Sequence, residues 1–213
     1  ENQMEVFDRV LRHNIRNDLN LIHGHAEMIA QTASEDVTEH GKKVMEESDQ
    51  LLESVAKQRD IMELLRNDTT YEKIDLPREL RNIHEDIHDK YSHADISIKT
   101  DSTIKIYTSN RLPNAVKELI ENAVQHNTVR DPQVTVKAKQ TKQKLKIHVA
   151  DNAEPIPEME RGVLLKPGER TPLYHGSGLG LWLIKLIVRE CGGTINFDEN
   201  EPHGNVIKLT IPR

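Results

Sequence analysis

Apolar residues in the first third of the chain follow a spacing that predicts two long helices. They recur every three, four or seven positions over residues 4–29 and again over 37–65, which places them on one face of each helix. The polar stretch 31–36 separates the two segments. We therefore expect an antiparallel hairpin with helices over about residues 2–31 and 36–66.

The hairpin also has apolar residues outside these two faces. A lone hairpin would leave them in water, whereas two hairpins packed as a four-helix bundle would cover them. The sequence therefore predicts a homodimer through residues 1–66, and the alternative is a monomer whose apolar faces pack against the rest of the chain. The residues concerned are Val6, Val10, Leu21, Leu52, Ile61 and Leu64.

The pattern changes after the polar segment 66–70, so we expect a hairpin domain over residues 1–67 and a second domain over 68–213. The second domain should be an α/β sandwich with helices on one face of a mostly antiparallel sheet, which makes the whole chain α+β. Its helices are expected at 77–91, 110–126 and 179–190. Short alternating segments predict the strands, with 96–99 and 104–107 paired to each other: 72–76, 96–99, 104–107, 134–136, 145–149, 194–197 and 206–211.

Charge and composition exclude several classes of protein. The net charge is −6 with both signs interspersed, so nucleic acid is not an expected partner. The single cysteine, Cys191, excludes an internal disulfide and favours the cytoplasm. No apolar run approaches the roughly 20 residues of a membrane-spanning helix, so we expect no membrane contact by this fragment. Because the chain starts at Glu1 in helical register, we expect an upstream sensor domain or membrane anchor outside it.

His13 is the first candidate for chemistry. It lies two positions from the apolar Leu11, about 200° around the helix, so it should face solvent beside Arg16 and Asn17. By itself this would describe an ordinary surface histidine.

Two further candidates carry oxygen ligands. Glu118 and Asn122 are four residues apart on a predicted helix and share one face, which suits Mg²⁺. Asp151 directly follows a strand, where a carboxylate can accept a hydrogen bond from an exocyclic amine such as that of adenine. Alone, the first pair could be a solvated helix face and Asp151 a turn residue.

The glycine-rich segment 176–181 opens the last helix and follows a long loop over 152–177. Its alternating glycines should expose backbone N–H groups at the helix N-terminus, where they can bind phosphate. The spacing differs from that of dinucleotide-binding proteins, and no strand precedes it. Long loops within compact domains are usually functional.

In this order and spacing, the motifs resemble the core of a sensor histidine kinase, and the resemblance covers nearly the whole chain. That core is a dimerisation and phosphoacceptor hairpin followed by a Bergerat-type ATP-binding domain. Residues 12–17 resemble the H box, especially its archaeal variant, 118–127 the N box, 151–157 the G1 box and 176–181 the G2 box. Residues 158–175 would form the ATP lid.

The resemblance implies that ATP binds with Mg²⁺ held by Asn122 and Glu118, and that His13 takes the γ-phosphoryl group. The group would pass to an aspartate of a response-regulator receiver domain. Asn17 matches the position that orients water, which implies phosphatase activity. The implied nucleotide contacts are Asn122, His126, Asp151, Ile156, Gly176, Ser177, Gly178, Leu179, Gly180 and Leu181.

Several residues depart from the family pattern. Asn14 follows His13 where an acidic general base is usual, and Ala153 and Pro155 replace two G1 glycines. Gln125 replaces the N-box lysine. The lid has no phenylalanine, and its packing would fall to one of three leucines: Leu164, Leu165 and Leu173.

Three other functions are compatible with parts of the pattern. The departures allow a non-catalytic nucleotide-binding scaffold, in which the hairpin dimerises and signals without phosphorylation. A gyrase-type ATPase is a second alternative, which the hairpin with His13 disfavours. His84, Glu85 and His88 match a zinc-dependent hydrolase motif, although no third metal ligand stands out nearby.

Overall fold

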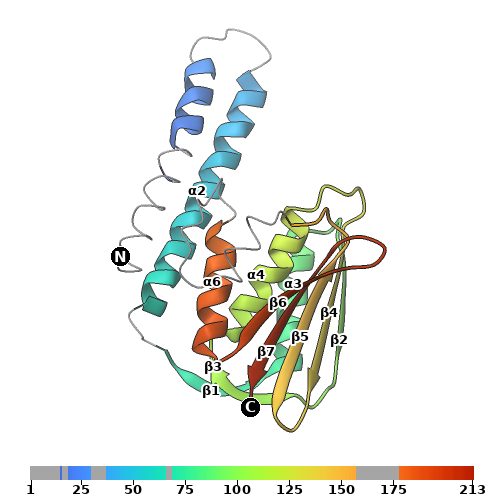
Figure 1. Ribbon diagram of the computed structural model, residues 1–213. Coiled ribbons are helices and arrows are strands. Elements are labelled where there is room, and N and C mark those ends of the chain that lie inside the picture. The colour runs from blue at the N-terminus through green and yellow to red at the C-terminus, as the bar shows by residue number, and fades with distance from the viewer. Residues whose placement is uncertain (1–14, 16–18, 30–36, 66–68, 157–177) are drawn as a thin grey trace. The chain divides into compact units, whose positions relative to one another are not determined.

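The computed structural model describes residue 15 and residues 19–29, 37–65, 69–156 and 178–213 (Figure 1). The chain divides into two compact units, one that includes Glu1–Asn67 and one that includes Asp68–Thr171 and Gly180–Arg213. Each unit is described by itself below.

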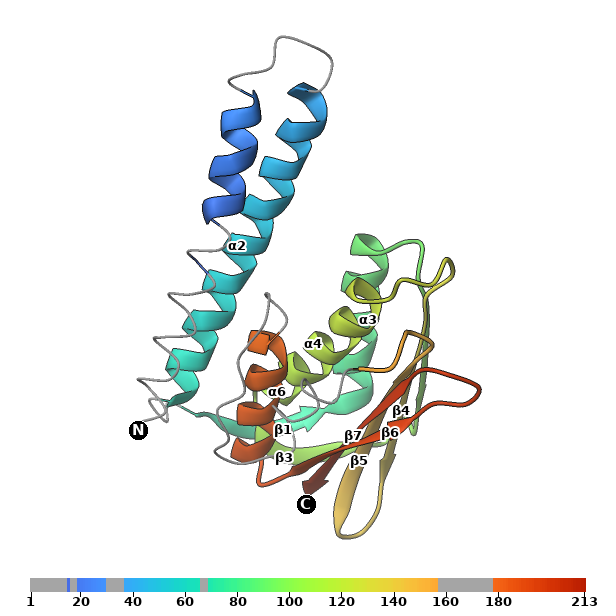
Figure 2. The ribbon, with the colours of Figure 1, turned by 45° about the horizontal axis from the view of Figure 1, so that its top comes forward.

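In the first unit, residues 19–29 are helical and α2 covers Val37–Leu65. The expected second helix is therefore confirmed, and the expected first helix is confirmed over its described part. Figures 1 and 2 both show the two helices side by side. Within the described ranges, no helix combines the length and the apolarity needed to cross a bilayer.

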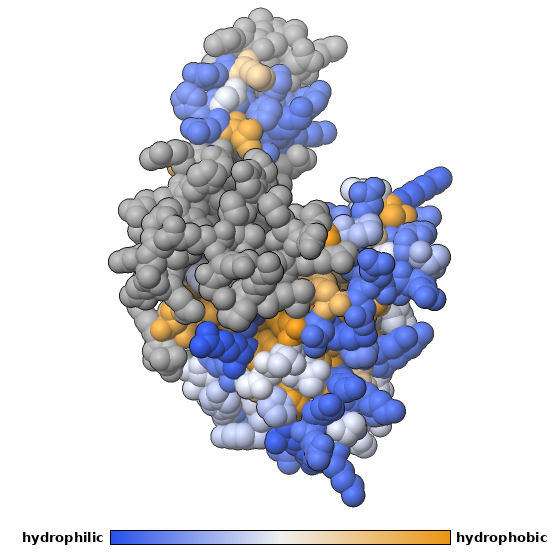
Figure 3. Space-filling model, viewed as in Figure 1, coloured by the Kyte–Doolittle hydropathy of each residue, from blue (hydrophilic) through white to orange (hydrophobic). Residues whose placement is uncertain are grey.

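Several large apolar side chains of this unit are exposed. Met45 and Leu52 are each 68% exposed, and they lie seven residues apart on one face of α2. Figure 3 shows apolar side chains interrupting the hydrophilic surface of the hairpin. The other exposed apolar residues of the unit are Leu19, Leu21, Met28 and Val55.

The described part of the second unit contains two sheets and three helices. A five-stranded sheet has the order β2-β4-β5-β7-β6, in which β2 is parallel to β4 and the other pairs are antiparallel. Helices α3, α4 and α6 cover one face of this sheet (Figure 2). The bounds are β1 Tyr71–Asp75, α3 Leu76–Lys90, β2 Asp95–Thr100, β3 Lys105–Ser109, α4 Leu112–Gln125, β4 Gln133–Gln140, β5 Lys144–Asp151, α6 Gly178–Glu190, β6 Thr194–Glu199 and β7 Asn205–Pro212.

The core is formed by apolar side chains at every second position of the strands and at every third or fourth position of the helices. In β5 every second residue from Leu145 to Asp151 is buried, and in α3 the buried residues lie three or four positions apart. Burying these side chains supplies most of the stability of the unit. The fully buried side chains with the largest volume in this unit are Leu76, Leu80, Ile87, Ile104, Ile106, Leu112, Leu119, Ile120, Leu145 and Ile147.

One predicted strand pairing is wrong. Segments 96–99 and 104–107 lie in strands, but β2 pairs with β4 and β3 pairs with β1. Strands β1 and β3 form a separate two-stranded sheet. In it Ile106 lies opposite Ile74, and both side chains are buried. Alternation specifies which face of a strand is buried, whereas it carries little information about the strand's partner.

Helices α3 and α4 begin differently. Asp75 caps α3 by accepting a hydrogen bond from the backbone N–H of Arg78 at 3.3 Å. The N-cap of α4 is Arg111, and no side chain caps this helix. Ser109, which lies just before it, donates to Glu190 Oε2 at 2.8 Å.

Candidate functional site

Two segments of the second unit bring three of the candidate site residues together. The middle of α4 carries Glu118 and Asn122, and the first turn of α6 carries Gly180. A Cβ atom on Gly180 would collide with Glu118 Oε1 and would lie 3.2 Å from Asn122 Nδ2. The N-box and G2-box residues are therefore in direct contact, and a larger residue at position 180 would require the Glu118 side chain to move.

The polar atoms at this contact suit a bound ion or phosphate group. Glu118 is 6% exposed, and Asn122 Nδ2 is buried with no hydrogen-bond partner in the described part of the chain. A buried polar group without a partner costs about 1–3 kcal/mol, so a ligand there would remove a penalty.

Mg²⁺ fits this donor set. It needs only one or two protein oxygens when phosphate oxygens and water complete the shell, and Glu118 and Asn122 supply a carboxylate and an amide. The described residues contain no group of three or more His, Cys, Asp or Glu side chains that could hold a metal ion. Within the described residues, a metal site with three or more such ligands is therefore not found.

Asp151 is the last residue of β5, and hydrogen bonds hold one of its two carboxylate oxygens. Its Oδ1 accepts three hydrogen bonds, from the backbone N–H of Ala153 at 3.0 Å and from the backbone N–H and side-chain Nδ2 of Asn205 at 3.1 and 3.0 Å. Within the described residues, Oδ2 has no such bond. This arrangement orients the carboxylate and leaves one acceptor for a donor such as an amine.

Burial changes the acidity of Asp151. The side chain is 6% exposed, and burial raises its pKa above 3.8, while the hydrogen bonds from Asn205 and Ala153 oppose the rise. The carboxylate is the form that accepts a hydrogen bond, so recognition of an amine by Asp151 should weaken in acid.

Sequence reasoning missed Asn205, the residue that organises this corner. It is 3% exposed, and besides Asp151 it contacts the turn that follows β5. Its Nδ2 donates to the Glu154 carbonyl at 3.0 Å and its Oδ1 accepts from the Ile156 N–H at 2.8 Å. The signal available was a polar residue after Gly204 at the start of the last strand.

The residues around the altered G1 positions pack closely. Ala153 is 7% exposed, and Gly204, with φ +125°, has no room for a Cβ beside the Asp151 carbonyl. Asn127, at the end of the N box, donates to Asn152 Oδ1 at 2.8 Å. The ends of α4 and β5 are thereby joined, a connection that the sequence did not suggest.

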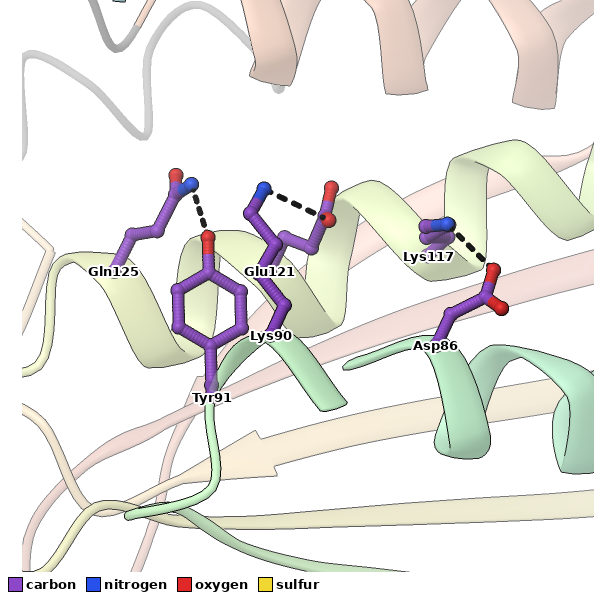
Figure 4. A network of polar contacts seen from close by, with 6 residues as sticks. All are labelled: Asp86, Lys90, Tyr91, Lys117, Glu121 and Gln125. Atoms are coloured by element: carbon purple, nitrogen blue, oxygen red, sulfur yellow. Dashed lines mark hydrogen bonds and ion pairs between the residues drawn. The ribbon is translucent and has the colours of Figure 1, made fainter. Parts of the chain in front are cut away.

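Contacts between α3 and α4 hold the helix that carries Asn122 (Figure 4). Gln125 Nε2 donates to the Tyr91 hydroxyl at 2.6 Å, and Lys90 Nζ lies 3.5 Å from Glu121 Oε1. Lys117 and Asp86 form a third contact, at 2.8 Å. Gln125, which stands where the family has a lysine, is therefore a neutral hydrogen-bonding residue directed at Tyr91.

The remaining predicted residues divide into two groups. His126 is exposed at the C-cap of α4, and Leu179, Gly180 and Leu181 are buried in the first turn of α6. Gly178 begins that helix. The other predicted residues lie outside the described part of the chain: His13, Asn14, Asn17, Gly176 and Ser177.

The hydrolase motif finds no support in the geometry. His84 and His88 stack with ring centroids 6.0 Å apart, but His84 Nε2 lies 3.1 Å from the Ile96 carbonyl oxygen. That contact joins α3 to β2 and explains His84 as a structural residue.

Known proteins resemble this chain over most of its length. It is 23% identical over 222 residues to the phosphate regulon sensor protein PhoR of Haemophilus influenzae, which covers all of this chain and 52% of PhoR. It is 26% identical over 228 residues to the signal transduction histidine-protein kinase ArlS of Staphylococcus aureus, covering 98% of this chain and 49% of ArlS. The chain therefore spans about half the length of these relatives.

Solved structures share the fold. The structure of histidine kinase ThkA in complex with response regulator protein TrrA is similar over 98% of this chain and 61% of the solved chain, with a TM-score of 0.74 and 20% identity. The structure of Acinetobacter baumannii histidine kinase AdeS is similar over 94% of this chain and 97% of the solved chain, with a TM-score of 0.72 and 18% identity.

The sequence over residues 107–213, half of the chain, matches the family described as histidine kinase-, DNA gyrase B-, and HSP90-like ATPase. This match contains both groups of contacting residues, Gly180 with Glu118 and Asn122 and Asp151 with Asn205. The chain therefore belongs to this ATPase family and carries the catalytic ATPase domain of a histidine kinase.

Proposed function

We propose that this chain is the catalytic core of a two-component histidine kinase, which phosphorylates His13 from ATP and passes the phosphoryl group to an aspartate of a response regulator. Residues 1–67 would be the dimerisation and phosphotransfer domain, and 68–213 the ATP-binding domain. The contact of Gly180 with Glu118 and Asn122 is the observation that carries the proposal. It supports a single site formed by the two segments proposed to bind phosphate.

In this proposal each end of the nucleotide has its own residues. Asp151 Oδ2 accepts the adenine amine while Asn205 holds Oδ1. Asn122 and Glu118 bind Mg²⁺, which would neutralise charge on the transferred phosphoryl group. The backbone of the 176–181 segment would bind the phosphates at the N-terminus of α6.

His13 would act as the nucleophile through its neutral ring. An imidazole with a pKa near 6.5 is largely unprotonated at neutral pH, so Asn14 needs only to orient it. Because an amide does not take a proton, we expect slow autophosphorylation or a carboxylate from elsewhere as the base. Asn17 would orient water for dephosphorylation of the response regulator.

The hairpin is proposed to dimerise. Exposed apolar residues such as Leu21, Met45 and Leu52 would be covered by a second hairpin in a four-helix bundle. The response regulator is proposed as partner because ThkA was solved in complex with one. A sensor domain is proposed upstream, because PhoR and ArlS are about twice as long as this chain, and this part would act in the cytoplasm.

Nucleotide binding tests the site directly. We expect the parent protein to bind ATP in the presence of Mg²⁺ and Asn122→Ala to lose Mg²⁺-dependent binding, because the amide contributes to the ion site. His13→Ala should bind ATP as the parent does but should accept no phosphoryl group. Equal binding by the parent and Asn122→Ala in calorimetry would refute the proposed site.

A nucleotide-binding scaffold without kinase activity is the second candidate. Ala153 and Pro155 in the G1 box and Asn14 after His13 favour it. This candidate predicts ATP binding that depends on Asp151, with no phosphorylation of the parent protein.

A further inference from the structure

His25 and His40 form a pair outside the ATP site. His25 lies in helix 19–29 and His40 in the first turns of α2, and their ring centroids are 5.7 Å apart with an interplanar angle of 33°. Figures 1 and 2 show these two segments side by side. The pair therefore connects two helices that are linked by the short stretch 30–36.

Both rings have a nitrogen that the fold leaves unsatisfied. The Nδ1 atoms of His25 and His40 are buried, and neither makes a hydrogen bond to any residue that the structure describes. A buried unsatisfied nitrogen is costly, and in native proteins such an atom often binds an ion or a water molecule. Two such atoms in one contact favour a shared ligand.

The side chains around the pair leave the rings available. The nearby carboxylates Glu27 and Glu39 pair with His23 at 3.7 Å and with Lys43 at 3.0 Å, respectively. His25 lies on the half-buried side of its helix with Ile22 and Ile29, so apolar groups make up part of its surroundings.

Two glycines are sequence neighbours of the pair. Gly24 precedes His25 and Gly41 follows His40, and a Cβ atom on either would meet no atom within 4 Å. Each glycine costs about 1 kcal/mol in a helix interior relative to alanine, and packing does not require either one. Water molecules would complete the coordination of an ion bound by the two rings.

We propose that His25 and His40 are the two protein ligands of a zinc-class divalent metal site that fastens helix 19–29 to α2. Imidazole nitrogen suits Zn²⁺, Ni²⁺ and Cu²⁺, whereas Mg²⁺ prefers oxygen. With a metal–nitrogen distance of about 2.0–2.1 Å, two rings on one tetrahedral ion have centroids roughly 5 Å apart. The observed separation of the centroids, 5.7 Å, is close to this value.

The site does not depend on the proposed kinase activity. Its ligands come from the helical unit alone, and its metal class differs from that of the ATP site. Because the ion would bind the folded hairpin and not the separated helices, it should stabilise the hairpin in proportion to ln(1 + [metal]/Kd).

Zinc titration of the full chain, freed of metal and without nucleotide, tests the proposal. We expect one equivalent to bind to the parent and the affinity to fall by about 100-fold in His25→Gln and in His40→Gln, the loss expected when one of two linked contacts is removed. The double variant should lose little more than either single variant, because one ion needs both rings.

His88→Gln is the matched control. It disrupts the other close histidine pair, whose centroids are 6.0 Å apart, and should leave zinc affinity unchanged. Hydrogen exchange of the parent provides a readout that needs no variant, since Zn²⁺ should protect residues 19–29 and the start of α2 while Mg²⁺ should not. Absence of zinc binding to the parent, protection confined to α3, or unchanged affinity in His25→Gln and His40→Gln would overturn the proposal.

Discussion

At the scale of single residues, Gly180 lies at the proposed phosphate end of the site. Its missing side chain lets the first turn of α6 approach Glu118 and Asn122. Asp151 has the same importance at the other end, because Asn205 fixes one of its oxygens and leaves the second for a ligand. Both residues act through their immediate contacts, so their substitution should affect binding before it affects the fold.

Gly180→Ala should weaken ATP binding by about 10- to 100-fold, because overpacking of this kind costs about 1–3 kcal/mol. Calorimetric titration of the folded variant measures the loss. Gly41→Ala is the control, since a Cβ there meets no atom within 4 Å, and this variant should bind ATP like the parent. Equal ATP affinity in both variants would show that α6 does not approach α4 as described.

Asp151 should make ATP binding sensitive to acid. Burial raises its pKa above 3.8, so affinity should begin to fall at a higher pH than for an exposed aspartate. The contribution of this group to the free energy of unfolding has the opposite trend: it is fully present below 3.8 and is lost as pH rises through the raised value. Asp151→Asn should bind weakly and without this acid limb, which a pH series of affinities would reveal.

At the scale of elements, the periodicity of apolar residues predicted where the helices lie but not which strands pair. The apolar spacing located α2, α3, α4 and α6 correctly, because helix faces are set by local sequence. The pairing of β2 with β4 could not be inferred, since it depends on segments about 40 residues apart. The same limit hid Asn205, which is 54 residues from Asp151. Glu118, Asn122 and Asp151 could be proposed from the sequence because short motifs contain them.

The buried face of α3 should contribute far more stability than its polar contacts with α4. Leu80 is fully buried, and Leu80→Ala should lower the free energy of unfolding by about 2–5 kcal/mol. The ion pair of Lys117 with Asp86 lies at the surface, so Lys117→Ala should cost less than about 1 kcal/mol. Denaturant unfolding compares them, and similar losses would contradict this division.

Strand β5 should make the second unit sensitive to mild acid. Burial lowers the pKa of His148 below 6.5, and Lys208, Lys146 and Lys137 lower it further. The unfolded chain therefore takes up a proton more readily, and stability is lost as pH falls from 6.5 through the lowered value. His148→Gln should show a smaller loss over this range in denaturant unfolding. An unchanged pH profile would exclude His148 as its source.

At the scale of the whole molecule, dimerisation is proposed to cover the exposed face of α2. Met45 and Leu52 are both 68% exposed, and Leu52→Glu would bury a charge in the proposed bundle. We expect this variant to shift toward monomer in light scattering. Leu52→Met, which keeps an apolar side chain of similar volume at the same position, is the control and should assemble like the parent. A monomeric parent, or no difference between the variants, would count against the bundle.

The central claim is that ATP bound in the second domain phosphorylates His13. Incubation with γ-labelled ATP and Mg²⁺, followed by acid or alkali treatment, tests it most directly. We predict a label on the parent that survives alkali and is lost in acid, as a phosphorus–nitrogen bond requires, and no label on His13→Ala. An equal label on both proteins, or ATP bound by the parent with no label, would contradict the account.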